Sequence, residues 1–447
     1  MTPTMVIFKS SRKAYKEGID VVVEDEIDPR DFSDQKLTFQ RVFTCPNKSR
    51  AFCKIFKESF VKTHELHEFV LVTRIGLHFV DFICDQIYTF ELKPKSHYTH
   101  FDVLGFISID CGAPAGVNYT ESSTGIIYIS DANFINTGES KSVVSELKST
   151  YQQQMWTLRS FPVGKRNCFK VNITRGSRYL IRTNFLYGNY DGLNKLPDFD
   201  LHLGPNRWDT VTIQNASTDV YYEIIHVPSL DYIQLCLADT GNGTPFISSI
   251  EIRTLKNDTY VAQFGSALQL YGRCDLGANT TVGAYRYKYD VYDRFWETCD
   301  SKQNWTSVQN ASIATASFGR NHYQLPAIVM STAVTPTNAS APLVISWKPQ
   351  HENDQFHAYL HFTEIQVLAA NQTRQFNITV GESRHENFSP QYHNVSTAYT
   401  RLPIRGKEIN FTLEMIKNST LPPIINAIEV YKVIDLQQLN TFQEDGT

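Results

Sequence analysis

Short runs of alternating apolar and polar residues dominate the chain from Phe106 onward. Clear examples are FISIDCG, SRYLIRTNFLYG, DFDLHLG, DYIQLCLAD and FISSIEIRTL, separated by segments rich in Gly, Pro, Asn and Asp. Alternation with a period of two is typical of β-strands, and the separating residues are typical of turns. Because this part shows no long run with a helical period, the pattern predicts an all-β region.

One stretch, YLIRTNFLYGNYDGLNKLPDFDLHLG at residues 179–204, combines strand patterns with a high density of rings and aspartates. Tyr179 and Phe185 fall on the same face of the first strand, since side chains alternate along a strand. That ring-rich face predicts that both residues pack in a core. Glycines and a proline then interrupt the alternation between residues 188 and 197, which predicts a loop, and loops are where ligands usually bind.

Three motifs recur in the same order at an almost constant separation. YLIRTNF matches FHAYLHF, FDLHLG matches FNITVG, and PFISSIEI matches PIINAIEV. A constant separation of about 177 residues indicates two copies of one unit, each of the usual size of a β-sandwich. We therefore expect one sandwich at residues 105–256, a linker and second sandwich at residues 257–434, and a tail at residues 435–447.

Residues 1–104 differ in composition and are dense in Lys, Arg, Asp and Glu. The segment SRAFCKIFKESFVKTHELHEFV has mixed helical character, which predicts an atypical extension that is irregular, partly helical or disordered. The N-terminus shows no uninterrupted apolar core of a secretory signal. The most apolar run, residues 69–84, is interrupted by Arg74, His78 and Asp81, so we expect no transmembrane helix.

The Asn-x-Ser/Thr triplet, which accepts N-linked glycans, is unusually frequent after residue 101. Fifteen triplets occur there, where about four are expected by chance. Fourteen are predicted glycosylation sites: Asn118, Asn172, Asn215, Asn242, Asn257, Asn279, Asn304, Asn310, Asn338, Asn371, Asn377, Asn394, Asn410 and Asn418. The fifteenth, Asn387, is a weaker acceptor because Pro390 follows its serine. The excess predicts a secreted or extracellular protein.

Candidate catalytic, metal-binding and nucleic-acid-binding features are weak. The net charge is −4, so the composition does not indicate the basic surface that a nucleic-acid-binding protein needs. Asp191, Asp198 and Asp200 offer a carboxylate pair of the glycosidase kind, but aspartate is also common in turns. His357 and His361 are four residues apart without the glutamate of H-E-x-x-H, in a segment of strand pattern. We expect no enzyme activity, no metal and no cofactor.

Several long motifs together resemble a known family. FISIDCG, YISDANFINTGES, EIIHVPSLDYIQLCLADTGNGTPFISSIEIRTL and YDVYDRFW are similar, in sequence and order, to the malectin-like ectodomain of plant leucine-rich-repeat receptor-like kinases. The resemblance covers about residues 105–434 and implies two tandem malectin-type β-sandwiches of jelly-roll, galactose-binding-like topology. The family continues into leucine-rich repeats, a transmembrane helix and a kinase. This sequence shows no L-x-x-L-x-L-x-x-N repeat and no H-R-D or D-F-G motif, so we expect a truncated, non-catalytic ectodomain.

Eight cysteines occur, with no Cys-x-x-Cys, which argues against a zinc ribbon or a thioredoxin-type motif. The family usually lacks cysteine at Cys274 and Cys299, so their joint occurrence suggests a disulfide between them. Cys168 and Cys236 lie in strand patterns that can be neighbours in a sandwich, which predicts a second disulfide. Cys111 is an alternative partner for either member of that second pair.

Two ligand classes remain open. The resemblance implies an extracellular recognition module at the plasma membrane, and we expect a peptide or protein ligand or a co-receptor in the cleft between the sandwiches. The alternative ligand is cell-wall carbohydrate. In that case Tyr187, Tyr190 and Trp208 would stack on sugar faces and Asp191 would bind hydroxyl groups. A purely structural spacer is the third interpretation.

Overall fold

The computed structural model describes residues 38–43, 86–91, 105–260, 265–278, 284–299, 304–314, 321–381 and 383–436. Contacts divide the chain into residues 1–99 and residues 100–447. In the first part, β1 (Thr38–Phe43) and β2 (Gln86–Glu91) pair antiparallel. The segment of predicted helical character lies outside the described residues.

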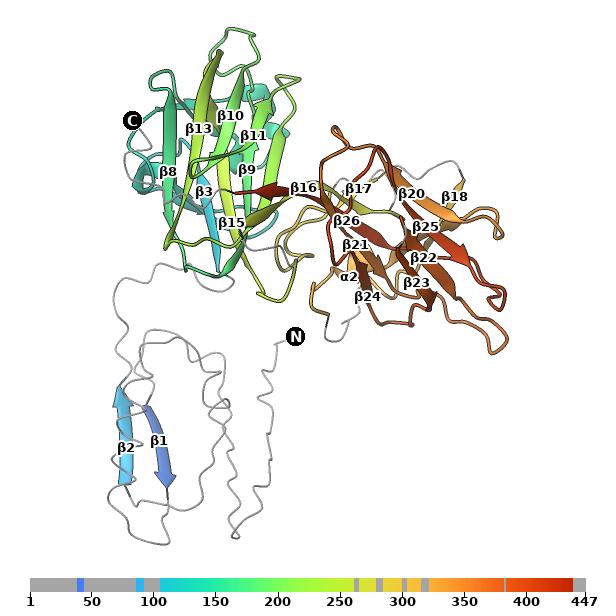
Figure 1. Cartoon of the computed structure of the whole chain (residues 1–447). Helices are drawn as coiled ribbons and strands as arrows, with labels where there is room; N and C mark the ends of the chain where they lie inside the picture. The colour runs from blue at the N-terminus through green and yellow to red at the C-terminus, as the bar shows by residue number, and fades with distance from the viewer. Residues whose placement is uncertain are drawn as a thin grey trace. The chain divides into compact units, whose positions relative to one another are not determined.

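The first copy is a β-sandwich with an outer sheet of four strands (Figure 1). Their order is β11 (Asn206–Thr212), β10 (Asp198–Leu203), β13 (Tyr232–Asn242) and β8 (Arg166–Asn172). Every second side chain of β10 is buried, as its DFDLHL pattern predicts. The alternating runs of the sequence therefore mark strands with one face in the core.

The second copy repeats this outer sheet strand for strand. Its order is β23 (Ser383–Phe388), β22 (Phe376–Val380), β25 (Ile409–Met415) and β20 (Leu343–Trp347). The turns match as well, because Gly204 after β10 has φ 57° and Gly381 after β22 has φ 53°. The sequence repeat therefore corresponds to two tandem β-sandwiches.

A single sheet of eleven strands runs through both copies. Its order is β24 (Ser396–Tyr399), β21 (Phe356–Phe362), β26 (Ala427–Asp435), β16 (Ser266–Asp275), β12 (Val220–His226), β9 (Arg178–Phe185), β15 (Ser249–Leu255), β3 (Phe106–Asp110), β5 (Ile127–Ser130) and β4 (Asn118–Thr120), with β17 (Glu297–Thr298) beside β16. β16 pairs with β26 of the second copy and, through Leu268 opposite Ile225, with β12 of the first. The two sandwiches thus share backbone hydrogen bonds.

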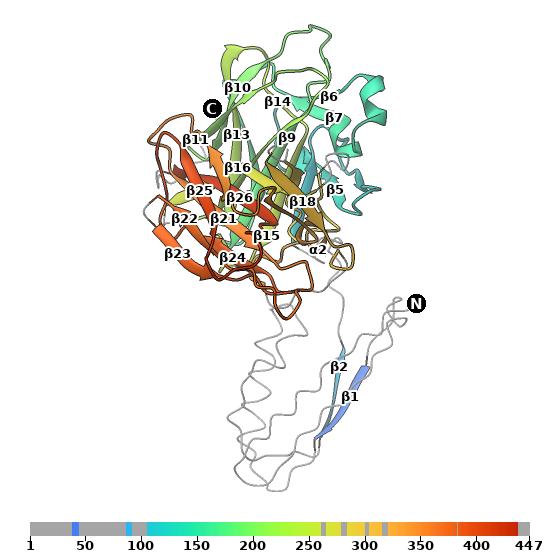
Figure 2. The same cartoon turned by 90° about the vertical axis from the view of Figure 1, so that its right-hand side faces the viewer.

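Smaller elements complete the sandwiches. They are the sheet of β14 (Phe246–Ile247), β7 (Thr157–Ser160) and β6 (Glu139–Ser142), the pair β18 (Trp305–Gln309) and β19 (Thr332–Pro336), the 3₁₀ turns η4 (Asp131–Asn133), η5 (Ser145–Ser149) and η6 (Gln153–Met155), and the single-turn helix α2 (Ala327–Met330). The view of Figure 2 shows β6 and β7 at the periphery of the first sandwich.

Each sandwich has its own apolar core, and the two cores are built alike. Phe185 and Phe199 meet in the first core with ring centroids 5.7 Å apart, and their repeat equivalents Phe362 and Phe376 meet in the second at 5.8 Å. Tyr179 and Phe185 are both buried, which confirms the core packing predicted for them.

A buried aspartate–threonine pair recurs near the first strand of each copy. The Thr157 hydroxyl donates to Asp110 at the end of β3, and the Thr332 hydroxyl donates to Asp275 at the end of β16, both at 2.6 Å. Burial raises the pKa of each carboxyl to about 7, although the threonine hydrogen bonds oppose the shift. Both aspartates are therefore about half protonated at pH 7 and protonated in acid.

Replacing both carboxyls (Asp110→Asn with Asp275→Asn) should remove a specific pH dependence of stability. In the native chain each carboxyl holds its proton up to about pH 7, whereas the unfolded chain releases it near pH 4. Stability from these groups is therefore full below pH 4 and falls by up to about 1.4 kcal/mol per pH unit per group as the pH rises to 7.

The measurement is the free energy of unfolding from pH 4 to 8 for wild type and double variant. Histidines whose pKa burial lowers, such as the half-buried His226 at about 4, have the opposite pH dependence, but they are common to both proteins. The difference between the two curves isolates the aspartates. Parallel curves would contradict the prediction.

Gly277, two residues after Asp275, sits against the backbone of Ala333, so a Cβ at this position would overlap it. Gly272, earlier in β16, has free space at the same position. Gly277→Ala is therefore expected to lower the free energy of unfolding by about 2–3 kcal/mol, because a rigid backbone must move. Chemical denaturation measures it, with Gly272→Ala as the matched control. Equal effects of the two substitutions would refute the explanation.

Candidate functional site

The aromatic residues predicted to bind sugar are only partly accessible. Tyr187 is fully buried, and its hydroxyl donates to Asp191 at 2.5 Å. Tyr190 is half-buried and packs edge-on against Tyr187 at 5.5 Å. The structure thus brings Tyr187, Tyr190 and Asp191 together, but the Tyr187 ring belongs to the first core.

Trp208 is 4% exposed and also belongs to the first core. Neither the Tyr187 ring nor the Trp208 ring, both predicted to stack on sugar, is open to solvent in this structure. The alternation of β9 continues past Phe185, which carries Tyr187 inward, and Trp208 lies on the buried face of β11. Asp191 remains exposed at the loop surface.

A surface cavity of about 440 Å³ lies between β11 and β12. Thr210, Thr212 and Thr218 line it, together with Tyr222 and the predicted glycosylation site Asn215. The Tyr222 hydroxyl donates to the Thr210 carbonyl at 3.0 Å, which fixes the ring at the cavity wall. This cavity contains none of the four residues predicted from the sequence.

Side chains of the two sandwiches meet directly beside the sheet that they share. An apolar cluster joins Leu180 of β9 and Ile225 of β12 to Leu268 of β16, Tyr359 of β21 and Tyr431 of β26. All five residues are at most 2% exposed. The two copies therefore share a buried apolar contact in addition to their common sheet.

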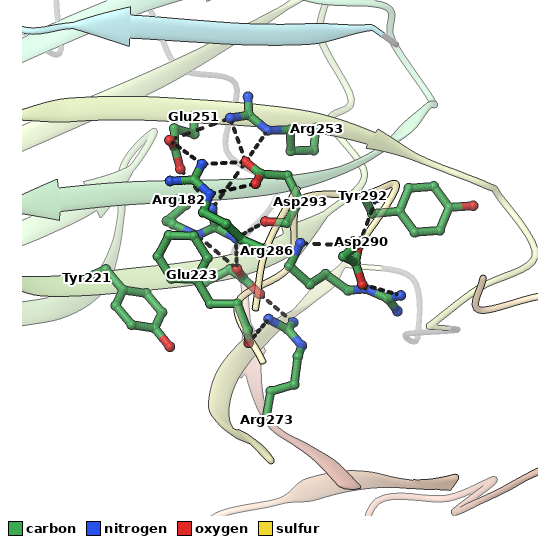
Figure 3. Close-up of polar contacts among 12 residues, drawn as sticks. Arg182, Tyr221, Glu223, Glu251, Arg253, Arg273, Arg286, Asp290, Tyr292 and Asp293 are labelled. Atoms are coloured by element: carbon green, nitrogen blue, oxygen red, sulfur yellow. Dashed lines mark hydrogen bonds and ion pairs between the residues drawn. The ribbon is translucent and has the colours of Figure 1, made fainter. Parts of the chain in front are cut away.

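Beside this cluster lies a buried network of ion pairs, part of which Figure 3 shows. It comprises Arg182, Glu223, Glu251 and Arg253 of the first copy and Arg273, Arg286, Asp290, Asp293, Arg294 and Glu429 of the second. Positive and negative groups are balanced in number. The balance matters because an unpaired buried charge is costly.

Several pairs of the network connect the two copies directly. Arg273 binds Glu223 at 2.6 Å, and Arg286 binds Glu251 at 2.9 Å. Asp293 accepts from Arg253 at 2.9 Å. We call the ten charged residues named in the preceding paragraph the junction network.

Arg182 is the centre of the junction network within the first copy. Its guanidinium binds Glu223 and Glu251, each at 2.8 Å, and donates to the Asp293 carbonyl at 2.5 Å. The guanidinium also stacks on the Phe295 ring at 3.7 Å. Burial opposes the ionisation of Glu251, but the surrounding arginines outweigh burial and hold its pKa well below the usual value. The Glu251 carboxylate therefore stays ionised in mildly acidic solution.

The junction network was not predicted from the sequence, although a signal for it exists. Glu251 and Glu429 occupy equivalent positions in the repeated motifs PFISSIEI and PIINAIEV. Both are fully buried in the structure, and both bind arginine. A charged residue inside an apolar strand in both copies indicates a buried ion pair.

The structure joins Cys168 to Cys236 and Cys274 to Cys299, the pairs expected from the sequence. Cys168 and Cys236 face each other across β8 and β13. Their repeat equivalents, Val344 and Thr412, face each other across β20 and β25. Cys111 directly follows β3 and is buried and unpaired; β3 and the β8–β13 pair lie in different sheets.

Most of the predicted glycosylation sites are exposed. Twelve acceptor asparagines lie at the surface, namely Asn118, Asn172, Asn215, Asn242, Asn257, Asn304, Asn338, Asn371, Asn387, Asn394, Asn410 and Asn418. Asn377 is buried, and its side chain accepts from the Asn387 backbone at 3.0 Å. Asn310 is half-buried and donates to the Ile365 carbonyl at 2.7 Å. Folding thus hides Asn377, which argues against a glycan there, and Asn279 lies outside the described residues.

Within the described residues, no cluster of His, Cys, Asp and Glu is arranged to hold a metal ion. None of the described helices has the length and apolar character needed to span a bilayer.

Comparison with known proteins gives consistent matches. The malectin-like domain family matches residues 109–433. A probable LRR receptor-like serine/threonine-protein kinase of Arabidopsis thaliana is 43% identical over 349 residues, which are 77% of this chain and 39% of that protein. The Arabidopsis LRR receptor-like serine/threonine-protein kinase IOS1 is 44% identical over 350 residues, 77% of this chain and 38% of IOS1. The chain therefore matches less than half the length of these relatives.

Solved structures share the fold at lower identity. The ANX2 ectodomain from Arabidopsis thaliana has a TM-score of 0.59 and 18% identity, covering 74% of this chain and 97% of that one. A chain in the structure of the plant peptide RALF23 in complex with FER and LLG2 has a TM-score of 0.56 and 16% identity, covering 74% and 95%. The chain therefore belongs to the malectin-like domain family, with the all-β, double-sandwich fold of plant receptor-like kinase ectodomains.

Proposed function

We propose that this chain is a non-catalytic, extracellular recognition module of a plant receptor-like kinase, and that its ligand is a peptide, a protein or a co-receptor. The family relation is the observation that carries the proposal, since relatives 43% and 44% identical are receptor-like kinases. One similar structure is a complex of the plant peptide RALF23 with FER and LLG2. The exposed glycan acceptors support an extracellular location.

The burial of candidate aromatic residues favours a peptide or protein over carbohydrate. Sugar sites need flat rings that are open to solvent, whereas Tyr187 and Trp208 are core residues. Tyr190 is half-buried against Phe246, with 5.5 Å between ring centroids. A stacking platform at this loop would require the core to open.

Carbohydrate remains the second candidate because of the threonine-lined cavity between β11 and β12. Thr212 and Thr218 are exposed there, and Tyr222 is half-buried beside them. Hydroxyl groups and one ring are suitable partners for a sugar. A glycan on Asn215 would stand at the same cavity.

Binding measurements on the full chain, expressed in a glycosylating secretory host, separate these candidates. We expect binding to at least one member of a panel of secreted plant peptides that includes RALF23, with no binding on a cell-wall glycan array and no glycan hydrolysis. Glycan binding that is lost in Thr212→Val would favour the carbohydrate site. Glycan turnover would overturn the non-catalytic assignment.

A further inference from the structure

Eight of the fourteen acceptor asparagines in the described residues lie in or beside edge strands, whereas Asn242, Asn257, Asn371, Asn377, Asn410 and Asn418 lie in or near inner strands. Asn118 lies in β4, Asn387 in β23 and Asn172 at the end of β8; Asn215 follows β11, Asn394 precedes β24, Asn338 stands between β19 and β20, and Asn304 and Asn310 flank β18. Each of these strands lies at a sheet edge. An open edge is a template for pairing with another chain, and a bulky glycan beside it obstructs such pairing.

β6 differs from these strands. It forms the edge of the sheet β14–β7–β6, at the periphery of the first sandwich (Figure 2), and all four of its residues are exposed. No acceptor triplet starts between Asn118 and Asn172. Among edge strands of three or more residues within 105–436, as far as these residues are described, β6 alone has no acceptor in or near it.

The backbone of β6 has hydrogen-bonding groups directed away from its neighbour. Val143 donates to the Trp156 carbonyl on the β7 side at 3.1 Å. Because direction alternates along an antiparallel strand, the N–H and C=O groups of Ser140 and Ser142 point to the opposite side. Val144 is the next residue whose backbone groups point to this outer side, and its N–H donates to the Gly188 carbonyl at 3.3 Å. One backbone bond on the outer side of the strand is thus already formed, beside a free stretch of edge.

The side chains of β6 indicate what kind of segment fits. Glu139 and Lys141 form an ion pair of 2.8 Å, with side chains 56% and 41% exposed. Charged side chains on an edge strand, lysine in particular, disfavour pairing with an arbitrary further strand. A polar, extended segment whose charges are opposite to those of Glu139 and Lys141 offsets that cost, and the exposed Val144 offers an apolar contact at the end of the strand.

We propose that β6 is the edge on which this module binds its peptide ligand, by adding an extended, polar segment as a further β-strand. Main-chain hydrogen bonds to Ser140 and Ser142 would supply affinity, and side chains beside Glu139 and Lys141 would supply specificity. The inference rests on the proposed function and adds the binding surface and the binding mode.

A single substitution tests the proposal, because Ser140→Asn creates an acceptor triplet with Ser142 and places a glycan on β6. The probe is a phage-displayed library of random dodecapeptides, selected on the full chain secreted from glycosylating cells. Binders are then measured on Ser140→Asn and on Ser140→Asn with Ser142→Ala, which keeps the first substitution but removes the acceptor. Intact mass confirms the added glycan, and thermal unfolding confirms that both variants fold.

We expect the selected peptides to lose binding to Ser140→Asn and to retain it on the double variant. Bound peptide should also slow hydrogen exchange of the Ser140 and Ser142 amides. Peptides that bind equally to all three proteins would overturn the β6 site while leaving peptide recognition intact. A library with no binder would count against both the site and the proposed function.

Discussion

Arg182→Met is expected to lower the free energy of unfolding by about 3–5 kcal/mol, because it removes one partner from a buried ion network. Methionine replaces the apolar part of the side chain but leaves Glu223 and Glu251 buried with one cation fewer. The Asp293 carbonyl also loses its donor. Guanidinium denaturation followed by tryptophan fluorescence measures the change, since Trp208 and Trp296 are buried in different copies.

Arg207→Met is the matched control. Arg207 pairs with Asp200 at 3.0 Å, but its side chain is 59% exposed. Exposed ion pairs contribute at most about 1 kcal/mol. An effect of Arg182→Met no larger than that of Arg207→Met would show that the junction network does not stabilise the fold.

Removal of the disulfide between Cys168 and Cys236, by alanine at both positions, should cost about 4 kcal/mol in the chain-entropy account. These cysteines are 68 residues apart, whereas Cys274 and Cys299 are 25 apart. In this account, closing the longer loop removes more conformational entropy from the unfolded chain. Alanine at Cys274 and Cys299 should therefore lower the free energy of unfolding by less, about 3.5 kcal/mol.

Free energies of unfolding under non-reducing conditions measure both effects. The wild type in reductant should lose stability comparable to the two pairs combined. A larger loss for the Cys274–Cys299 variant than for the Cys168–Cys236 variant would contradict the loop-length explanation.

The sequence predicts the sandwich fold well because strands leave a local period. DFDLHL alternates in the sequence and alternates in burial as β10. The repeated motifs also reveal topology, since Phe185 and Phe362 end equivalent strands of the two copies. The strand pattern is a property of one segment, and the repeat spacing is a property of two aligned segments. Both can therefore be read directly from the sequence.

The candidate site was harder to predict, because the accessibility of its residues depends on which strand faces the rest of the fold covers. β9 is buried on both faces, on one side by the first core and on the other by the second copy. Tyr187, just after this strand, is therefore also buried and does not face solvent from the loop. The pairing of Glu223 with Arg273 joins residues 50 apart in sequence, and Arg273 with Glu429 joins residues 156 apart. Ion pairs between residues so far apart produce no periodic pattern in either segment, so the sequence pattern does not predict them.

The central claim is that the two sandwiches form one body through their shared sheet, apolar cluster and junction network. Differential scanning calorimetry of the full chain tests it most directly. We predict one transition for the sandwiches, with calorimetric and van't Hoff enthalpies equal, and a lower midpoint for that whole transition in Arg182→Met. Two separate transitions in the wild type, with Arg182→Met shifting one of them, would contradict it.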